Sequence, residues 1–388
     1  MDIIKNIRTY SLIEWLVFFV IIAHFPPWFM WRNGYSTLCQ YAGVVLLLLI
    51  FIKRNRLKSA SGFTIFLFFL LYFVVIQIFN NIHLSYILIC AGYLIAANLR
   101  IKECTNVINL ITNYVFLSIL IPLPLWLFHQ YVMPLPLYEI LDISSIKGAN
   151  GVFMENYFFF VTFSGTEAMR FYSWYDEPGV LGTLAPFILF ANQFNMKDKR
   201  IPIIIVGCLF TFSMAFYILS LIGWLYINRH SLKSIILTLL SIVLISLLLC
   251  YFLQDNLAFQ QSVIYRFTNF SETGVDSRNS FETNMIWNSM KSTGDLIFGL
   301  GSGAMNNYGG ISSSYKSFII EFGYVGCFLL LTAYYKLLRY KNLLGIFTLF
   351  LFSLSFLQRP QLFTAGWFLL YSCVIGYLSY ANQNITRK

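Results

Sequence analysis

Two groups of charged and aromatic residues interrupt an otherwise apolar chain. The first is Arg170-Phe171-Tyr172-Ser173-Trp174-Tyr175-Asp176-Glu177-Pro178-Gly179, which ends where a long apolar run begins. Arginine binds phosphate well because its planar fork makes bidentate hydrogen bonds and keeps its charge. Either carboxylate, Asp176 or Glu177, can act as a general base. Structural roles also fit this group: a helix cap for Asp176 before Pro178, and an ion pair with Glu167 or Glu177 for Arg170.

The second group spreads over residues 266–326. It contains four basic residues, a glycine-rich run and a motif that opens an apolar segment: Arg266, Arg278, Lys291, Lys316, Phe298-Gly299-Leu300-Gly301-Ser302-Gly303 and Glu321-Phe322-Gly323. The glycine-rich run lacks the Lys-Ser/Thr of a P-loop and a preceding strand, so it predicts a tight turn rather than a nucleotide site. A backbone anion nest is a weaker interpretation of the same glycines.

The amino-acid composition indicates which kind of structure must position these residues. Of the 388 residues 58% are apolar and 11% are charged, whereas a soluble domain has about 45–50% and about 25%. A soluble enzyme, a disordered chain and a secreted disulfide scaffold are therefore excluded. We expect a polytopic, all-α integral membrane protein that forms a single membrane domain over residues 1–388.

Apolar runs of the length needed to cross a bilayer recur along the whole chain. The candidate spans are 12–29, 36–52, 62–80, 84–98, 107–132, 178–195, 201–213, 214–228, 234–253, 313–335, 343–357 and 361–380. The pair within 201–228 is short and is expected to form tilted helices or a re-entrant hairpin. The pattern predicts about twelve transmembrane helices.

The basic residues orient this map, because Lys and Arg concentrate in cytoplasmic loops. With both termini cytoplasmic, 18 of the 26 basic residues fall on the inner side. The net charge of +10 is thus an inside-positive bias and does not indicate a nucleic-acid partner. Five of the eight outer basic residues stand near the predicted membrane surface and favour an anionic ligand there: Arg170, Arg266, Arg278, Lys316 and Arg359. For any one of them, and for Arg266 above all, a solvated or salt-bridged surface position is the simpler interpretation.

Two outer connections, 133–177 and 254–312, are much longer than the inner loops. Long loops in a compact protein are usually functional. Within the first, Val152–Phe163 is too short to span and predicts an interfacial or re-entrant helix, or a loop packed on the bundle. The histidines and the seven cysteines have no metal-ligand or disulfide spacing, so we expect neither a metal nor a cofactor.

With its twelve predicted spans, two enlarged outer loops and these motifs, the chain resembles the bacterial O-antigen polymerase (Wzy-type) family, whose superfamily also contains the O-antigen ligases. The motifs are the Arg170–Gly179 element, Arg278 with Trp287, the Phe298–Gly301 run and Glu321-Phe322-Gly323. Ligases typically have a His-Asn pair where this chain has Ser314-Tyr315-Lys316, and this difference favours the polymerase.

The resemblance implies a C-type glycosyltransferase bundle in the bacterial inner membrane, with its active face in the periplasm. Such an enzyme moves a growing glycan from polyprenyl pyrophosphate (undecaprenyl pyrophosphate) onto a lipid-linked repeat unit. Arg170 and Arg278 would stabilise the departing pyrophosphate, supported by Arg359, Lys316 and Arg266. Glu177, or else Asp176, would accept the proton of the attacking hydroxyl.

The aromatic residues Trp174, Tyr175 and Tyr315 would stack on sugars or on the prenyl chain, although anchoring at the helix boundary explains each equally well. The expected partners are the lipid-linked oligosaccharide, membrane lipid, a chain-length regulator and a flippase. Two other functions fit less well: an O-antigen ligase that transfers polymer to lipid A–core, and a flippase for lipid-linked oligosaccharides. A flippase predicts short loops on both sides and charges in mid-span, unlike this chain.

Overall fold

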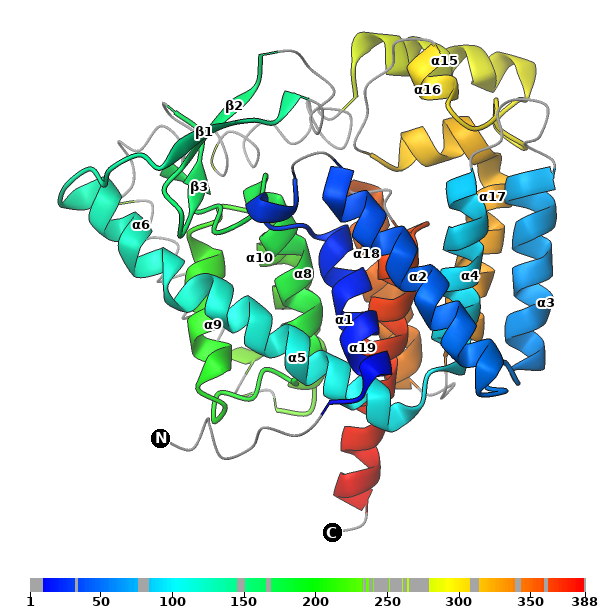
Figure 1. The fold of residues 1–388 in the computed structure, drawn as a ribbon, viewed down its shortest axis with the longest axis horizontal. Coiled ribbons are helices and arrows are strands. Elements are labelled where there is room, and N and C mark those ends of the chain that lie inside the picture. The colour runs from blue at the N-terminus through cyan, green and yellow to red at the C-terminus, as the bar shows by residue number, and fades with distance from the viewer. Residues whose placement is uncertain are drawn as a thin grey trace.

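The computed structural model shows a mostly helical protein (Figure 1). It describes residues 10–31, 34–75, 84–144, 151–164, 169–231, 233, 235–236, 240, 251, 260, 264, 279–307, 314–338, 343–358 and 362–386. Arg266, Arg278 and Arg359 lie outside the described residues, as does most of the predicted span 234–253.

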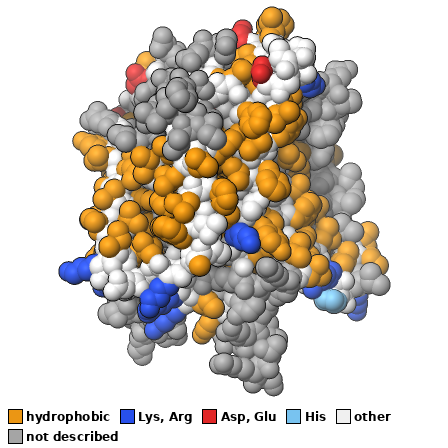
Figure 2. Space-filling model, turned by 90° about the vertical axis from the view of Figure 1, so that its right-hand side faces the viewer, with side chains coloured by type: hydrophobic (Ala, Val, Ile, Leu, Met, Phe, Trp, Pro, Cys, Tyr) orange, Lys and Arg blue, Asp and Glu red, His pale blue; other side chains and the backbone are white. Residues whose placement is uncertain are grey.

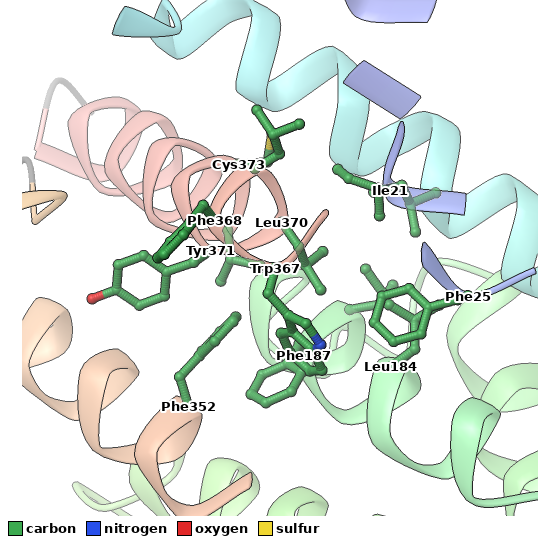
Figure 3. Close-up of a cluster of buried hydrophobic side chains, with 14 of the residues drawn as sticks. Ile21, Phe25, Leu184, Phe187, Phe352, Trp367, Phe368, Leu370, Tyr371 and Cys373 are labelled. Atoms are coloured by element: carbon green, nitrogen blue, oxygen red, sulfur yellow. The ribbon is translucent and has the colours of Figure 1, made fainter. Parts of the chain in front are cut away.

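The centre of the bundle is α19 (Ala365–Thr386), which packs against α1 (Leu12–His24), α4 (Leu84–Asn98), α5 (Ile101–Leu120) and α8 (Pro178–Ala191). Figure 3 shows its Trp367 side chain among aromatic residues from three other helices. The ring centroid of Trp367 lies 5.3 Å from that of Phe25, 5.5 Å from that of Phe187 and 5.7 Å from that of Phe352. These contacts join helices from the beginning, middle and end of the chain into one core.

The remaining helices surround this centre. On one side lie α2 (Tyr35–Lys53), α3 (Ala60–Phe69) with its π-helical continuation η3 (Leu70–Val75), and α17 (Tyr315–Lys336). On the other lie α6 (Pro122–Tyr131), α9 (Arg200–Leu209) and α10 (Met214–Ile227). Between the two sides, α18 (Leu343–Gln358) contacts both α17 and α10. The described residues also form the short or surface helices η1 (Trp28–Met30), α15 (Phe281–Thr293) and α16 (Ala304–Asn307).

Helices occur at the predicted spans that fall within the described residues. Three helical segments are long and apolar enough to cross a membrane, namely Tyr35–Lys53, Ile101–Tyr131 and Tyr315–Lys336. The others are shorter apolar helices, such as α1 with 13 residues and α8 with 14. The total of twelve spans stays a prediction.

The surface is divided along the axis of the bundle. In Figure 2 a broad band of apolar side chains separates an end where most Lys and Arg lie from an end with Asp and Glu. The exposed Lys53, Arg54 and Lys58 belong to the α2–α3 turn at the lower end of Figure 1. Leu49 on α2 and Phe63 on α3 are more than half exposed in the band. An exposed apolar surface of this kind is typical of lipid contact.

The expectation of an all-α fold is wrong in the first long loop, which forms a small antiparallel sheet. Strands β1 (Glu139–Asp142), β2 (Phe153–Asn156) and β3 (Val161–Thr162) pair in the order β1-β2-β3, with Leu141 opposite Met154. The segment 152–163 is therefore two strands and a turn, and neither the interfacial nor the re-entrant helix forms. Burial alternates along β2, because Met154 and Asn156 face inward while Phe153 is exposed. A period of two is the pattern of a half-buried strand.

Candidate functional site

The Arg170–Gly179 element is fastened to the bundle by its backbone. The Phe171 amide donates to the Phe210 carbonyl at 2.9 Å, and Nε of Arg170 donates to the Thr211 carbonyl at 3.2 Å. Ser173 has a positive φ of 59°, and its hydroxyl donates to the Ser118 carbonyl on α5. Arg170 is therefore half-buried beside the turn between α9 and α10.

The two carboxylates of this element lie at the start of α8. Glu177 occupies the N-cap position with Pro178 in the first helical turn, but its side chain makes no capping hydrogen bond. Asp176 and Glu177 are both half-buried. The N-cap position thus belongs to Glu177 and not to Asp176, for which the sequence suggested a capping role; a contribution of the Asp176 carboxylate to the cap stays a prediction.

The two aromatic residues before α8 differ in exposure. Trp174 is half-buried, and its ring centroid lies 5.7 Å from that of Tyr114 and 6.4 Å from that of Phe29. Its carbonyl accepts a 2.7 Å hydrogen bond from the Trp28 amide, which joins η1 to this element. Tyr175 has no exposed surface. Its ring therefore belongs to the core in this conformation, and stacking of Tyr175 on a ligand stays a prediction.

In the second long loop, α15 lies over the first half of α17 (Figure 1). Lys316 is 6% exposed, and its Nζ lies 3.2 Å from Oδ1 of Asn284 and 5.5 Å from the centroid of the Trp287 ring. Tyr315 packs edge-on against the same tryptophan at 6.0 Å. A lysine desolvated against a tryptophan face gains cation–π stabilisation. The described contacts place Lys316 under α15, away from the contacts of Arg170.

The glycine-rich run and the Glu321-Phe322-Gly323 motif form one unit. Helix α17 is broken at Gly323, where φ is 64° and ψ is −177°. Four hydrogen bonds of 2.7–3.1 Å join the backbone on both sides of the break to residues 296–301: Leu300 N to Ile320 O, Gly301 N to Glu321 O, Tyr324 N to Leu296 O and Val325 N to Ile297 O. Backbone groups released by a helix break need new partners when they are buried. Residues 296–301, which overlap the turn predicted over residues 298–303, supply them.

Glycine is required at two positions because the two backbones touch. A Cβ on Gly323 would lie 2.3 Å from the Ile297 carbonyl oxygen, and a Cβ on Gly299 would lie 2.5 Å from the Glu321 carbonyl oxygen. Both residues also have positive φ, which residues with a side chain rarely adopt. The two motifs that carry the resemblance thus meet through their glycines.

A tyrosine from η3 joins this unit to the bundle. The Tyr72 hydroxyl lies 2.7 Å from the Phe322 carbonyl oxygen and 3.1 Å from the Phe298 carbonyl oxygen. The hydroxyl therefore bridges α17 and the glycine-rich run at the break, and it serves as a hydrogen-bond donor to the Phe322 carbonyl next to Gly323.

The carboxylate of Glu321 lies beside this break. Its Oε1 accepts a 3.2 Å hydrogen bond from the Gly303 amide. The neighbouring Ser302 hydroxyl pairs with the Tyr86 hydroxyl at 2.6 Å, and Tyr86 lies within electrostatic reach of Glu321. Tyr72 and Tyr86 were not predicted as site residues, because a tyrosine in an apolar span gives no distinctive signal. Glu321 did give one, since it is the only carboxylate in the predicted span 313–335.

Comparison with protein-family models, with curated proteins and with solved structures found no match. The residues of the two long connections and of the broken helix α17 therefore indicate what chemistry this end of the bundle can perform. The described part provides a half-buried arginine, a buried lysine, two carboxylates before α8, and a carboxylate with two hydroxyls at the broken helix. Such groups can bind an anion and accept a proton from a hydroxyl.

Proposed function

We propose that this chain is a membrane-embedded glycosyltransferase of the O-antigen polymerase type. It would join oligosaccharide units carried on undecaprenyl pyrophosphate at the periplasmic face of the bacterial inner membrane. The proposal includes the twelve-span topology with cytoplasmic termini, a flippase that supplies the lipid-linked units, and a separate chain-length regulator.

The observation that carries the proposal is the backbone unit formed by residues 296–301 and 320–325. These residues contain both motifs of the second loop on which the resemblance rests, and four hydrogen bonds join them. Elaborate backbone pairing at a helix break is costly to build and is common at binding sites in membrane proteins. The unit lies at the end of the bundle opposite the basic α2–α3 turn, as the outward-facing site requires (Figure 1).

The basic side chains at this end suit a reaction whose energy comes from the donor substrate. The bond between the sugar and the pyrophosphate supplies the energy, so no nucleotide is needed outside the cell. Negative charge grows on the pyrophosphate as it leaves, and preorganised cations at that point are the main source of catalysis. Arg170 and Lys316 are alternative candidates among the described residues, since their contacts are separate, and we propose Arg278, Arg359 and Arg266 as further ones.

The decisive experiment is deletion of the gene, followed by inspection of the lipopolysaccharide ladder. Loss of a polymerase leaves core capped with a single repeat unit. Bare core with accumulating lipid-linked polymer would identify a ligase instead, and bare core without outward-facing polymer would identify a flippase. A ladder of normal length would refute all three activities.

Complementation with Arg170→Ala tests the cation. We expect the single-unit pattern although the protein is present in the membrane at the wild-type level, because the leaving group loses its partner. Arg54→Ala is the matched control, since Arg54 is exposed at the opposite, basic end. A full ladder from Arg170→Ala would remove Arg170 from the mechanism without refuting the polymerase.

A further inference from the structure

Glu321 is an acidic residue in the apolar helix α17, close to the point where this helix is broken. It lies two residues before Gly323, the residue at which the regular helix ends. Its backbone carbonyl accepts from the Gly301 amide at 3.0 Å, while its side chain accepts from the Gly303 amide at 3.2 Å. The glycine-rich turn therefore donates hydrogen bonds to both the main-chain carbonyl and the side-chain carboxylate of Glu321.

The groups around the carboxylate are those that bind sugars. The half-buried Tyr86 hydroxyl, held at 2.6 Å by the buried Ser302 hydroxyl, can donate to or accept from a sugar hydroxyl. The Tyr86 ring packs 5.7 Å from Phe322 and 5.8 Å from Phe363, forming an apolar wall beside the polar groups. Few precisely oriented polar groups on an aromatic wall are typical of small-molecule sites.

The hydrogen bond from the Gly303 amide can be accepted by a glutamine as well as by a glutamate, so this contact does not by itself require a charged residue in an apolar helix. A charge there is costly, so an ionisable residue in such a position indicates function. Glu321 is also only partly buried, which leaves the carboxylate able to meet a ligand.

We infer that Glu321 is the general base of the transfer reaction and that Tyr86, held by the Ser302 hydroxyl, orients the acceptor hydroxyl beside it. The inference rests on the proposed function, and it replaces Glu177 and Asp176 in that role. The acceptor hydroxyl oxygen forms a bond to the anomeric carbon of the donor, and its proton passes to the Glu321 carboxylate. The bond from that carbon to the pyrophosphate breaks, and undecaprenyl pyrophosphate departs with the electron pair.

The test uses the purified full chain in detergent or nanodiscs, with synthetic lipid-linked repeat units as donor and acceptor. Glu321→Gln retains an oxygen for the Gly303 amide but cannot take a proton. We expect its turnover to fall by about 10²–10⁴-fold, the usual contribution of a general base, while its melting temperature and its affinity for the lipid-linked acceptor stay near those of wild type. Glu282→Gln, at an exposed carboxylate on α15, is the matched control and should retain full turnover.

Further measurements keep the assignment falsifiable if Glu321→Gln folds poorly. Glu321→Asp retains a carboxylate and should be more active than Glu321→Gln at equal folded concentration. The wild-type rate should fall on the acid side of its pH profile, and this limb should be missing from the residual activity of Glu321→Gln.

The outcomes distinguish the role of Glu321 from the proposed function of the whole chain. Polymer formation by wild type together with an unchanged rate and pH profile in Glu321→Gln would overturn the role of Glu321 alone. A wild type that forms no polymer under conditions where it binds both lipid-linked substrates would overturn the proposed function, and the base with it.

Discussion

The most direct test of the broken-helix unit is Gly323→Ala. The change adds one methyl group at the point where α17 and the glycine-rich turn are in backbone contact. Gly323 combines a φ of 64° with a ψ of −177°, a conformation that is essentially restricted to glycine. The added Cβ would also lie 2.3 Å from the carbonyl oxygen of Ile297 and 2.6 Å from its carbon. No side-chain rotation relieves this overlap, because both partners are main-chain atoms.

The magnitude follows from these two effects. Holding a residue with a side chain in such a conformation costs about 1–3 kcal/mol. Relieving the overlap moves the turn away from α17 and strains the hydrogen bonds from Tyr324 N to Leu296 O (2.8 Å) and from Val325 N to Ile297 O (3.1 Å). Leaving one buried backbone group without its partner costs about 1–3 kcal/mol. We therefore expect Gly323→Ala to lower the free energy of unfolding by about 2–6 kcal/mol.

Gly294→Ala is the matched control. Gly294 also has a positive φ, of 80°, but a Cβ there meets no atom within 4 Å. Its replacement should cost only the left-handed conformation, about 1–2 kcal/mol. Unfolding of both purified variants by SDS titration in mixed micelles measures the difference. Equal losses of stability would refute the claim that backbone contact, rather than φ alone, requires glycine at position 323.

Two further changes test other contacts. Tyr72→Phe removes the hydroxyl that lies at the break in α17 and leaves buried backbone groups without a partner. We expect it to lower the free energy of unfolding by about 1–3 kcal/mol. Tyr324→Phe, at a half-exposed ring, is the control, and equal stability of the two variants would contradict a stabilising contact of the Tyr72 hydroxyl. Glu103→Gln breaks the 2.7 Å ion pair with Arg56, whose side chains are 11% and 9% exposed, and should cost about 3–5 kcal/mol in the same titration. A loss below about 1 kcal/mol, typical of a surface pair, would show that water screens this pair.

Much of the architecture was predictable because it depends on composition and periodicity. Helices occur where apolar runs of sufficient length predicted them, and the basic α2–α3 turn lies at the opposite end of the bundle from α15. The sheet was missed because β2 and β3 are only four and two residues long. Strands this short carry too few alternations to compete with a helical interpretation in an aromatic-rich segment. The short strands are instead held by pairing, as in Leu141 opposite Met154.

The amino-acid sequence by itself determined which segments are apolar, which loops are basic, and where two long connections interrupt the apolar pattern. These properties depend on the types and order of the residues and not on which residues come into contact in the folded protein. Only the tertiary structure decided that Gly323 breaks α17, that residues 296–301 fill the break, and that Tyr72 reaches it from a distant helix. The physical reason is that these contacts are made by main-chain groups and one hydroxyl. Backbone amides and carbonyls are the same in almost every residue, so the sequence does not record which of them will meet.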